Sequence, residues 1–385
     1  MLTALAIANY RSLRHAVVPL QRLNVVTGAN GSGKSNLYRA LRLLADTAQG
    51  RIVHSLAAEG GLSSTLWAGP EAPSPAVRRG EMPLEGTRRK QPVNLRLGFA
   101  SDEFGYLIDL GLPPQSPETP PAFKHDPAIK RECIWHGAVQ RPASTVVDRD
   151  GPILRVRDAA GEWAVADAEL SSFDSMFFSL ADPARAPEMW RLREAIRNWR
   201  FYDHFRTDSD APVRAPRIGN FTPILSNDGA DLAAAIQTIL ELGDAESFRS
   251  AINNGFPGSE VEVNTTAGRF ELTMRQPGLL RALSIAELSE GTLRYLFWTA
   301  ALLTPRPPAL MVLNEPETSL HPDLLPPLAA LIRNASRRTQ LVVVTHAAPL
   351  AAALANDNAI HLEKRHGETT VAGFGTTPPW HWPAR

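Results

Sequence analysis

The fold of this chain is decided by one short stretch, Gly28-Ala29-Asn30-Gly31-Ser32-Gly33-Lys34-Ser35, which is followed by Asn36. The stretch has the form G-x-x-x-x-G-K-[ST]. The apolar segment 23–26 before it is typical of a buried strand, and residues 36–45 after it carry apolar side chains at helical spacing. A strand, a glycine-rich loop and a helix in this order predict a phosphate-binding loop.

Each residue type in this loop has a chemical reason. Glycines let consecutive backbone N–H groups turn toward a phosphate at the positive end of the helix dipole. Lys34 can reach the β- and γ-phosphate oxygens, and the Ser35 hydroxyl can ligate Mg²⁺. A dinucleotide-binding G-x-G-x-x-G is excluded, because the run that starts at Gly31 has Asn36 where the third glycine belongs. An unliganded glycine turn is the other alternative, and the flanking strand and helix argue against it.

Two later apolar segments also end in polar residues. Segment 310–313 is followed by Asn314 and Glu315, and segment 341–344 is followed by Thr345 and His346. A carboxylate directly after such a strand can orient and deprotonate an attacking water. His346 would bring an imidazole to the same edge of a parallel sheet. Each segment alone also fits an ordinary strand with a polar end.

A third motif, Glu287-Leu288-Ser289-Glu290-Gly291-Thr292, precedes the helical stretch 293–303. Ser and Gly at the start of a helix form a corner that binds anions. Taken alone, the motif is equally well explained by a serine N-cap. Four motifs in this order along one chain favour a nucleotide site.

The bulk composition is that of a soluble globular protein, with 44% hydrophobic and 21% charged residues among 385. The 40 basic residues balance the 40 acidic ones, so any contact with nucleic acid needs a local patch. Cys133 is the only cysteine, which excludes an internal disulfide and a cysteine-cluster metal site. The sequence shows neither a signal peptide nor an apolar run of membrane-spanning length, so we expect a cytoplasmic protein with no membrane partner.

The pattern along the chain predicts an α/β fold. Apolar strands that alternate with helices occur at both ends and predict a parallel core sheet. Alternating apolar residues at 93–99 and 106–110, and short strands near 153–156 and 163–165, predict an inserted antiparallel sheet. We expect a single head over 1–385, with a parallel nucleotide-binding core at 1–50 and 304–385, an inserted antiparallel sheet with loops at 51–180, and a helical lobe at 184–303.

These motifs together resemble the RecF/SMC-type branch of ABC ATPases, and within it the stand-alone predicted ATPases of bacteria. The resemblance rests on Asn9-Tyr10-Arg11-Ser12, the loop GANGSGKSN, the signature LSEGT, and NEPETSLHPD followed by VVVTH. It covers residues 1–48 and 284–350. Without sustained heptads, and with a short proline-containing tail after Val371, we expect a compact head that lacks a coiled coil and a nuclease domain.

The resemblance implies a P-loop NTPase fold, ATP and Mg²⁺ as cofactors, and a role for each matching residue. Glu315 would polarise the attacking water, and His346 would contact the γ-phosphate. Ser289 and Gly291 would contact the ATP held by the opposite subunit, so that ATP closes a homodimer, and segment 319–322 would lie at the dimer contact. The residues implied in nucleotide binding are Gly28, Asn30, Gly31, Ser32, Gly33, Lys34, Ser35, Asn36, Arg11, Ser289 and Gly291, and those at the metal are Ser35 and Asn314.

Two positions depart from the family pattern. Asn314 stands where relatives usually have Asp, which removes a negative charge beside the ion and predicts slow hydrolysis. Glu290 stands where the ABC signature has Gly.

Beyond ATP, the sequence leaves two functions open. The resemblance favours action on DNA, in repair, maintenance or defence. The alternative is a regulatory subunit that senses ATP and controls an effector protein, such as a nuclease in an anti-phage or toxin system. A small-molecule kinase is disfavoured by the signature motif and by His346. The candidate DNA contacts, for which solvated surface is the simpler reading, are a basic loop with Arg78, Arg79, Arg88, Arg89 and Lys90 and a predicted helical face with Arg193, Arg197 and Arg200.

Overall fold

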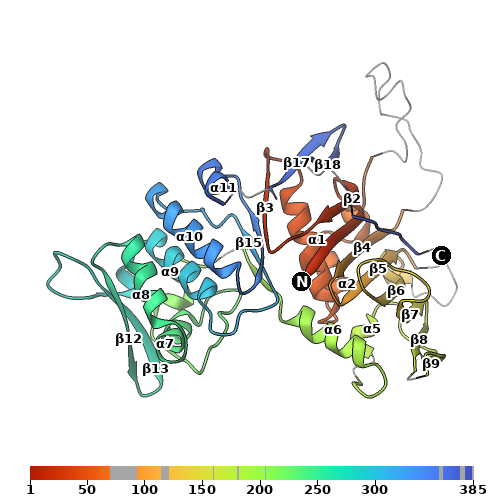
Figure 1. The fold of residues 1–385 in the computed structure, drawn as a ribbon, viewed down its shortest axis with the longest axis horizontal. Coiled ribbons are helices and arrows are strands. Elements are labelled where there is room, and N and C mark those ends of the chain that lie inside the picture. Colours follow the sequence, from red (N-terminus) through yellow and green to blue (C-terminus); the bar gives the residue numbers. More distant parts are fainter. Residues whose placement is uncertain are drawn as a thin grey trace. The chain divides into compact units, whose positions relative to one another are not determined.

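The computed structural model describes residues 1–69, 93–113, 121–158, 160–179, 182–203, 205–354, 359–372 and 378–383. The chain divides into two compact units (Figure 1). The first contains residues 1–21, 28–198 and 360–385, and the second contains 22–27 and 199–359. No helix in the described ranges is long and apolar enough to cross a membrane.

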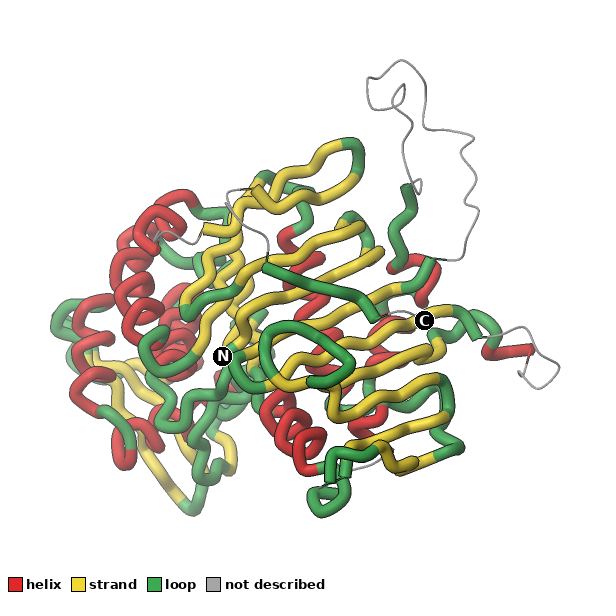
Figure 2. The backbone as a smooth tube through the Cα atoms, turned by 45° about the vertical axis from the view of Figure 1, so that its right-hand side comes forward, coloured by secondary structure: helices red, strands yellow, loops and turns green. Residues whose placement is uncertain are grey.

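The first unit is built on an eight-stranded antiparallel sheet, whose strands lie side by side in Figure 2. Its order is β2-β1-β4-β5-β6-β7-β8-β9. The strands that we predicted from alternating apolar residues are β4 and β5, which pair as a hairpin. Strand β5 is buried over its whole length. The strands are β1 (Leu2–Tyr10), β2 (Leu13–Pro19), β4 (Leu95–Ser101), β5 (Phe104–Gly111), β6 (Ala128–His136), β7 (Thr145–Asp150), β8 (Ile153–Arg157) and β9 (Trp163–Asp167).

The glycine-rich loop leads into helix α1 (Lys34–Thr47) of this unit. Its apolar stripe, which includes Leu37, Leu41 and Leu44, is buried, and the helix packs against β1, β4 and α6 (Pro187–Arg197). Strand β18 (Glu368–Ala372) pairs with β17 (Ala359–Arg365) and lies against β2. The shorter helices are α2 (Ile52–Ala58), α3 (Leu62–Thr65) and α5 (Met176–Ser179).

A fully buried ion pair fixes the middle of the antiparallel sheet. Nη1 of Arg149 on β7 lies 2.8 Å from Oε2 of Glu132 on β6, and neither side chain reaches solvent. Glu132 also accepts hydrogen bonds from the hydroxyls of Tyr106 (2.8 Å) and Ser175 (2.6 Å). Because both charges have hydrogen-bonding partners, the desolvation cost of burying them is offset.

The second unit contains four parallel strands in the order β10-β15-β16-β3. In this register Asn314 on β15 lies beside Val344 on β16, and Val344 lies beside Val26 on β3. Since parallel strands share one carboxyl edge, the polar residues that follow β15 and β16 emerge at the edge where β3 ends. The strands are β10 (Arg200–Tyr202), β15 (Leu310–Asn314), β16 (Gln340–Val344) and β3 (Leu23–Gly28).

Helices and a smaller antiparallel sheet complete the second unit (Figure 1). Helix α9 is buried on nearly all sides, and it contacts α7, α8 and α10. The helices are α7 (Leu232–Leu242), α8 (Ala245–Gly255), α9 (Glu290–Leu302), α10 (Leu325–Ala335) and α11 (Ala348–Leu354). The smaller sheet has the order β11-β13-β12, with β14 paired to β13, and comprises β11 (Arg217–Ile218), β12 (Glu260–Thr266), β13 (Arg269–Arg275) and β14 (Leu283–Ser284).

The predicted fold class, an α/β head with a parallel sheet, an inserted antiparallel sheet and a helical lobe, is confirmed. One placement differs from expectation: we expected residues 1–50 in the parallel core, whereas β1 and β2 begin the antiparallel sheet. The reason is that Leu13–Pro19 continues as a strand and pairs with β1 across a two-residue turn. The division of the chain at residues 50, 180 and 303 stays a prediction.

Candidate functional site

The glycine-rich loop has a backbone that its glycines require. Gly28, Gly31 and Gly33 have φ of 147°, 76° and 108°, values that other residues rarely adopt. Space is limiting too, because a Cβ at Gly33 would collide with Oγ1 of Thr369 and one at Gly28 with the carbonyl oxygen of Leu362. Residues with side chains would not fit at Gly28 and Gly33, so the loop presents its main chain at these positions.

Three features of the loop fit a bound phosphate. Helix α1 starts after Gly33, and within the described residues it has no side-chain cap and no acidic residue in its first turn, so N–H groups at its start are available to an anion. Oγ of Ser32 is buried and has no hydrogen-bond partner among the described residues. Nζ of Lys34 donates to the carbonyl oxygens of Gly28 (2.6 Å) and Ala29 (3.1 Å), which holds the ammonium over the loop. Donors without an acceptor at a helix N-terminus are what a triphosphate needs.

Hydrogen bonds among side chains of the first unit hold the glycine-rich loop in place. Oγ1 of Thr369 on β18 donates to the carbonyl oxygen of Ser32 at 2.7 Å and lies 2.7 Å from the hydroxyl of Ser12. Nδ2 of Asn36 donates to the same Ser12 hydroxyl at 2.8 Å. The structure thus gives Asn36 a bracing contact, and it adds Ser12 and Thr369, to which sequence analysis assigned no role.

Arg11 is engaged by a carboxylate of its own unit. Its Nη2 lies 2.8 Å from Oε2 of Glu59, which also accepts a hydrogen bond from the Tyr10 hydroxyl at 2.7 Å. Burial, and then the hydrogen bond to Glu59, raise the pKa of Tyr10 far above its ordinary value. Arg11 has a φ of 49°, and its amide donates to the carbonyl oxygen of Thr65. A contact between Arg11 and nucleotide stays a prediction.

In the second unit, the end of β15 presents an amide and a carboxylate. Oδ1 of Asn314 is buried and has no partner within the described part of the chain. An unpaired buried acceptor fits a hydrogen bond from a Mg²⁺-bound water. The next residue, Glu315, has a φ of 49°, its amide donates to the carbonyl oxygen of Val344 at 2.7 Å, and its side chain is 42% exposed. Glu315 is therefore held by its backbone with a carboxylate that water can reach.

His346 lies between two carboxylates. Its Nδ1 is 3.7 Å from Oε1 of Glu315 and 3.2 Å from Oε1 of Glu317. Glu317 is buried, and the same Oε1 accepts hydrogen bonds from the Thr345 hydroxyl (2.6 Å) and from the amides of His346 (2.9 Å) and Ala347 (3.1 Å). Glu317 lies in the motif NEPETSLHPD, but no role was expected for it.

The signature motif forms the start of helix α9, and hydrogen bonds fix its backbone. Ser289 is the N-cap of α9, and its Oγ accepts a hydrogen bond from the amide of Thr292 at 3.2 Å. The guanidinium of Arg214 donates to the carbonyl oxygens of Ala286 and Leu288, both at 3.0 Å, and to that of Thr207 at 2.8 Å. Arg214, which sequence analysis missed, therefore fixes the backbone that leads into Ser289.

The segment expected at the dimer contact, residues 319–322, lies in the turn after β15, and we call it the D-loop candidate. Ser319 has a φ of 61°, and His321 caps the short helical turn at Pro322–Leu324 by accepting from the amide of Asp323 at 3.3 Å. Gly291 lies against this turn, since a Cβ there would be 2.8 Å from the carbonyl oxygen of Ser319. The structure thus brings the signature and the D-loop candidate together within one unit.

The candidate DNA contacts gain no support from the structure. The basic loop with Arg78, Arg79, Arg88, Arg89 and Lys90 lies outside the described residues. The prediction of one helical face with Arg193, Arg197 and Arg200 is wrong, because α6 ends at Arg197 and Arg200 begins β10. The chain leaves the helix at Asn198 to place Tyr202 and Phe205 in the core, where Phe205 stacks on Phe297 at 4.4 Å. Tyr202 and Phe205 therefore have a packing role.

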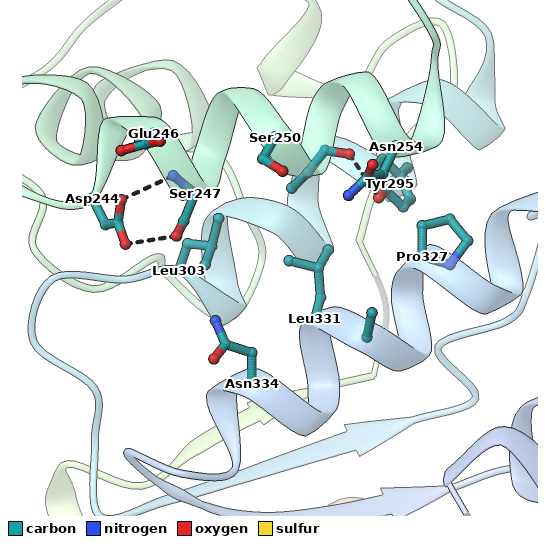
Figure 3. A pocket seen from close by; sticks show the side chains of 12 residues that line it. Asp244, Glu246, Ser247, Ser250, Asn254, Tyr295, Leu303, Pro327, Leu331 and Asn334 are labelled. Carbon is teal, nitrogen blue, oxygen red and sulfur yellow. Dashed lines mark hydrogen bonds between the residues drawn. The ribbon is translucent and has the colours of Figure 1, made fainter.

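A cavity of about 370 Å³ lies between α8, α9 and α10 and contains none of the motif residues (Figure 3). Its most prominent carboxylate, Asp244, is used locally, because it accepts hydrogen bonds from the amide (2.9 Å) and hydroxyl (2.6 Å) of Ser247 as the N-cap of α8. The Tyr295 hydroxyl donates to the carbonyl oxygen of Ala251. These groups serve the helices, so the cavity is not the candidate site.

Comparison with known proteins agrees with this geometry. The family model described as "AAA domain, putative AbiEii toxin, Type IV TA system" matches residues 23–351, and the chain belongs to this family. No curated protein matches the sequence. The predicted resemblance to RecF/SMC-type heads is confirmed, and the chain has the P-loop NTPase fold of SMC heads.

Two solved structures share the fold over nearly the whole chain. One is an SMC head bound to the C-winged helix domain of ScpA, with 14% identity, a TM-score of 0.51, and coverage of 96% of this chain and 97% of that chain. The other is an SMC head with an extended coiled coil bound to the C-terminal domain of ScpA, derived from Pyrococcus furiosus, with 14% identity, a TM-score of 0.50, and coverage of 96% and 95%. At this identity the likeness concerns the fold.

Proposed function

We propose that this chain binds ATP with Mg²⁺, hydrolyses it slowly, and closes as an ATP-sandwiched homodimer. The observation that carries the proposal is the phosphate loop: among the residues that the structure describes, no side chain caps α1 and none pairs with the Ser32 hydroxyl, and the Lys34 ammonium lies above the backbone. Bound ATP and Mg²⁺ supply the phosphoanhydride and the charge that polarises it. The chain's residues supply position and proton transfer.

Each residue then has a defined task. Lys34 and the N–H groups of residues 31–35 would donate to the phosphate oxygens, and the Ser35 hydroxyl and the Asn314 amide are the groups that would hold the metal ion. Glu315 orients the attacking water and accepts its proton, and His346 donates to the γ-phosphate. Ser289 and Gly291 serve the nucleotide of the partner subunit. The register of β15 and β16 supports the assignment of Asn314, Glu315 and His346, because the two strands end side by side at the same edge of the parallel sheet, with Asn314 beside Val344.

Calorimetry with ATP tests the proposal. Lys34→Ala should abolish measurable binding, because it removes the charge-assisted hydrogen bonds to the phosphates. Lys124→Ala, at an exposed lysine of the same unit, is the matched control and should bind ATP as the wild type does. Equal affinity in the two variants would refute the site.

Two downstream roles have separate support. Action on DNA follows the resemblance to SMC-type heads, whereas control of an effector protein is favoured by the toxin–antitoxin description of the family. A pull-down with Glu315→Gln in ATP, analysed for both nucleic acid and protein, separates them, and Lys34→Ala is its negative control. ATP-dependent recovery of DNA alone supports the first role, and recovery of one stoichiometric protein supports the second.

A further inference from the structure

Glu290 links the start of α9 to the turn that follows β15. Its Oε1 accepts hydrogen bonds from the hydroxyl of Ser319 at 3.0 Å and from Nε of Arg294 at 3.1 Å. The backbones meet at the same place, since a Cβ on Gly291 would lie 2.8 Å from the carbonyl oxygen of Ser319. A side-chain bond and a close backbone approach therefore join the signature to the turn.

The turn itself is well fixed. Glu315 at its start and Ser319 near its end have φ of 49° and 61°, both in the left-handed region. The amide of Glu315 donates to the carbonyl oxygen of Val344 at 2.7 Å, and the amide of Leu320 donates to that of Glu317 at 3.0 Å. Since few backbone conformations satisfy these constraints, a shift at Ser319 would be passed on to Glu315.

The charges favour the link at neutral pH. The hydrogen bond from Ser319, and then the one from Arg294, hold the pKa of Glu290 below its ordinary value, so the carboxylate stays ionised. Arg294 is buried, with its side chain only 9% exposed, and Glu290 is the partner that offsets the cost of burying this charge. Glycine at position 290, as in the ABC signature, would provide neither contact.

We propose that Glu290 is a positioning residue for ATP hydrolysis, which couples the signature helix to the turn that carries Glu315 in the same subunit. The inference rests on the proposed function. The signature serves the partner's nucleotide, whereas Glu315 serves the subunit's own. Closure at one site would therefore be transmitted through Glu290 and Ser319 to the water-activating carboxylate at the other.

Steady-state kinetics and ATP calorimetry test the link. Ser319→Ala removes one hydrogen bond without stranding a charge, and it should lower kcat about two- to tenfold, as expected for one hydrogen bond, with an unchanged Kd for ATP. Glu290→Ala should lower kcat at least as much, the double variant should lose no more than Glu290→Ala alone, and Glu290→Gln should recover part of the rate. Thr318→Ala, at the exposed hydroxyl next to Ser319, is the control and should match the wild type.

The outcomes separate the two proposals. If the wild type neither binds nor hydrolyses ATP, the proposed function fails and this role fails with it. If the wild type turns over and Ser319→Ala has the same kcat, or if the losses of the two single variants add, the role of Glu290 alone is refuted. Urea unfolding of Glu290→Ala shows whether this variant is folded. If Glu290→Ala is unstable, the kinetics of Ser319→Ala decide the question.

Discussion

Glu317 holds His346 by its main chain: Oε1 of Glu317 accepts a hydrogen bond from the amide of His346 at 2.9 Å and lies 3.2 Å from its Nδ1. Glu315, two residues earlier, has a half-exposed carboxylate 3.7 Å from the same nitrogen. The two carboxylates of one motif therefore have different surroundings. Glu317 orders the loop after β16, and Glu315 is available for chemistry.

This difference predicts that substitution of the two carboxylates changes the free energy of unfolding by very different amounts. Glu317→Ala would leave the Thr345 hydroxyl and the amide of His346 without their acceptor, and it would remove one of the two acceptors of the Ala347 amide. We expect it to lower the free energy of unfolding by about 2 kcal/mol or more, the cost of stranding buried donors. Glu315→Ala should change it by less than about 0.5 kcal/mol, as at exposed sites. Urea unfolding measures both, and an equal loss in the two variants would contradict the assignment.

Thr369 offers a test of the brace beside the phosphate loop. Thr369→Val keeps the shape of the side chain but removes the hydrogen bond to the carbonyl oxygen of Ser32 and the contact with Ser12. We expect ATP affinity to fall about three- to tenfold, the value of one or two hydrogen bonds. Thr370→Val is the matched control, since this neighbouring threonine is exposed. Calorimetry that finds the same Kd in both would show that the loop holds its shape without the brace.

The sequence predicted the elements whose signal is local. The hairpin of β4 and β5 follows from strict alternation, and the phosphate loop from eight consecutive residues. Strand β6 was missed because Lys130, Arg131 and Glu132 interrupt its apolar pattern. Glu132 is nevertheless fully buried, because Arg149 from the next strand neutralises it, and such a pairing is visible only once the strands are paired.

The site shows the same limit. The motif residues are contiguous and could be predicted, but Thr369 lies 337 positions from Ser32 in sequence, and nothing in the segment 368–372 marks it as a partner of the loop. Arg214 likewise reaches the carbonyl oxygen of Leu288 across 74 positions. Long-range hydrogen bonds to backbone carbonyls leave no sequence pattern, since every residue has the acceptor.

The amide at position 314 leads to a prediction about the rate of ATP hydrolysis. Asn314→Asp should raise kcat or strengthen the dependence of the rate on Mg²⁺, because a carboxylate beside the ion favours the metal-bound transition state. The Oδ1 of Asn314, which is buried and has no hydrogen-bond partner among the residues described, marks the position that the new carboxylate would take. A magnesium titration of the steady-state rate measures the effect. If neither kcat nor the titration changes, the amide already does what the carboxylate would do.

The last prediction concerns assembly. Ser289 is the N-cap of α9, and its Oγ accepts a hydrogen bond from the amide of Thr292 at 3.2 Å. We propose that the other N–H groups at the start of this helix bind an anion. We expect this helix start to serve the γ-phosphate held by a second subunit related by a two-fold axis. ATP would then favour the closed dimer through contacts that ADP lacks. Glu315→Gln with ATP and Mg²⁺ should be dimeric, whereas Ser289→Arg should bind ATP and remain monomeric.

Ser289→Arg also removes the N-cap, which by itself costs about 1 kcal/mol of stability. Ser289→Asp separates the two effects, since aspartate caps the helix as well as serine does but repels a phosphate. Both variants should therefore stay monomeric in ATP, and only the arginine variant should be less stable to urea. Light scattering of these proteins and of Glu315→Gln, each with ATP and with ADP, makes the comparison. A dimer in Ser289→Asp with ATP, or an oligomeric state that no nucleotide changes in any variant, would contradict the sandwich, because the signature would then have no part in holding the two subunits together.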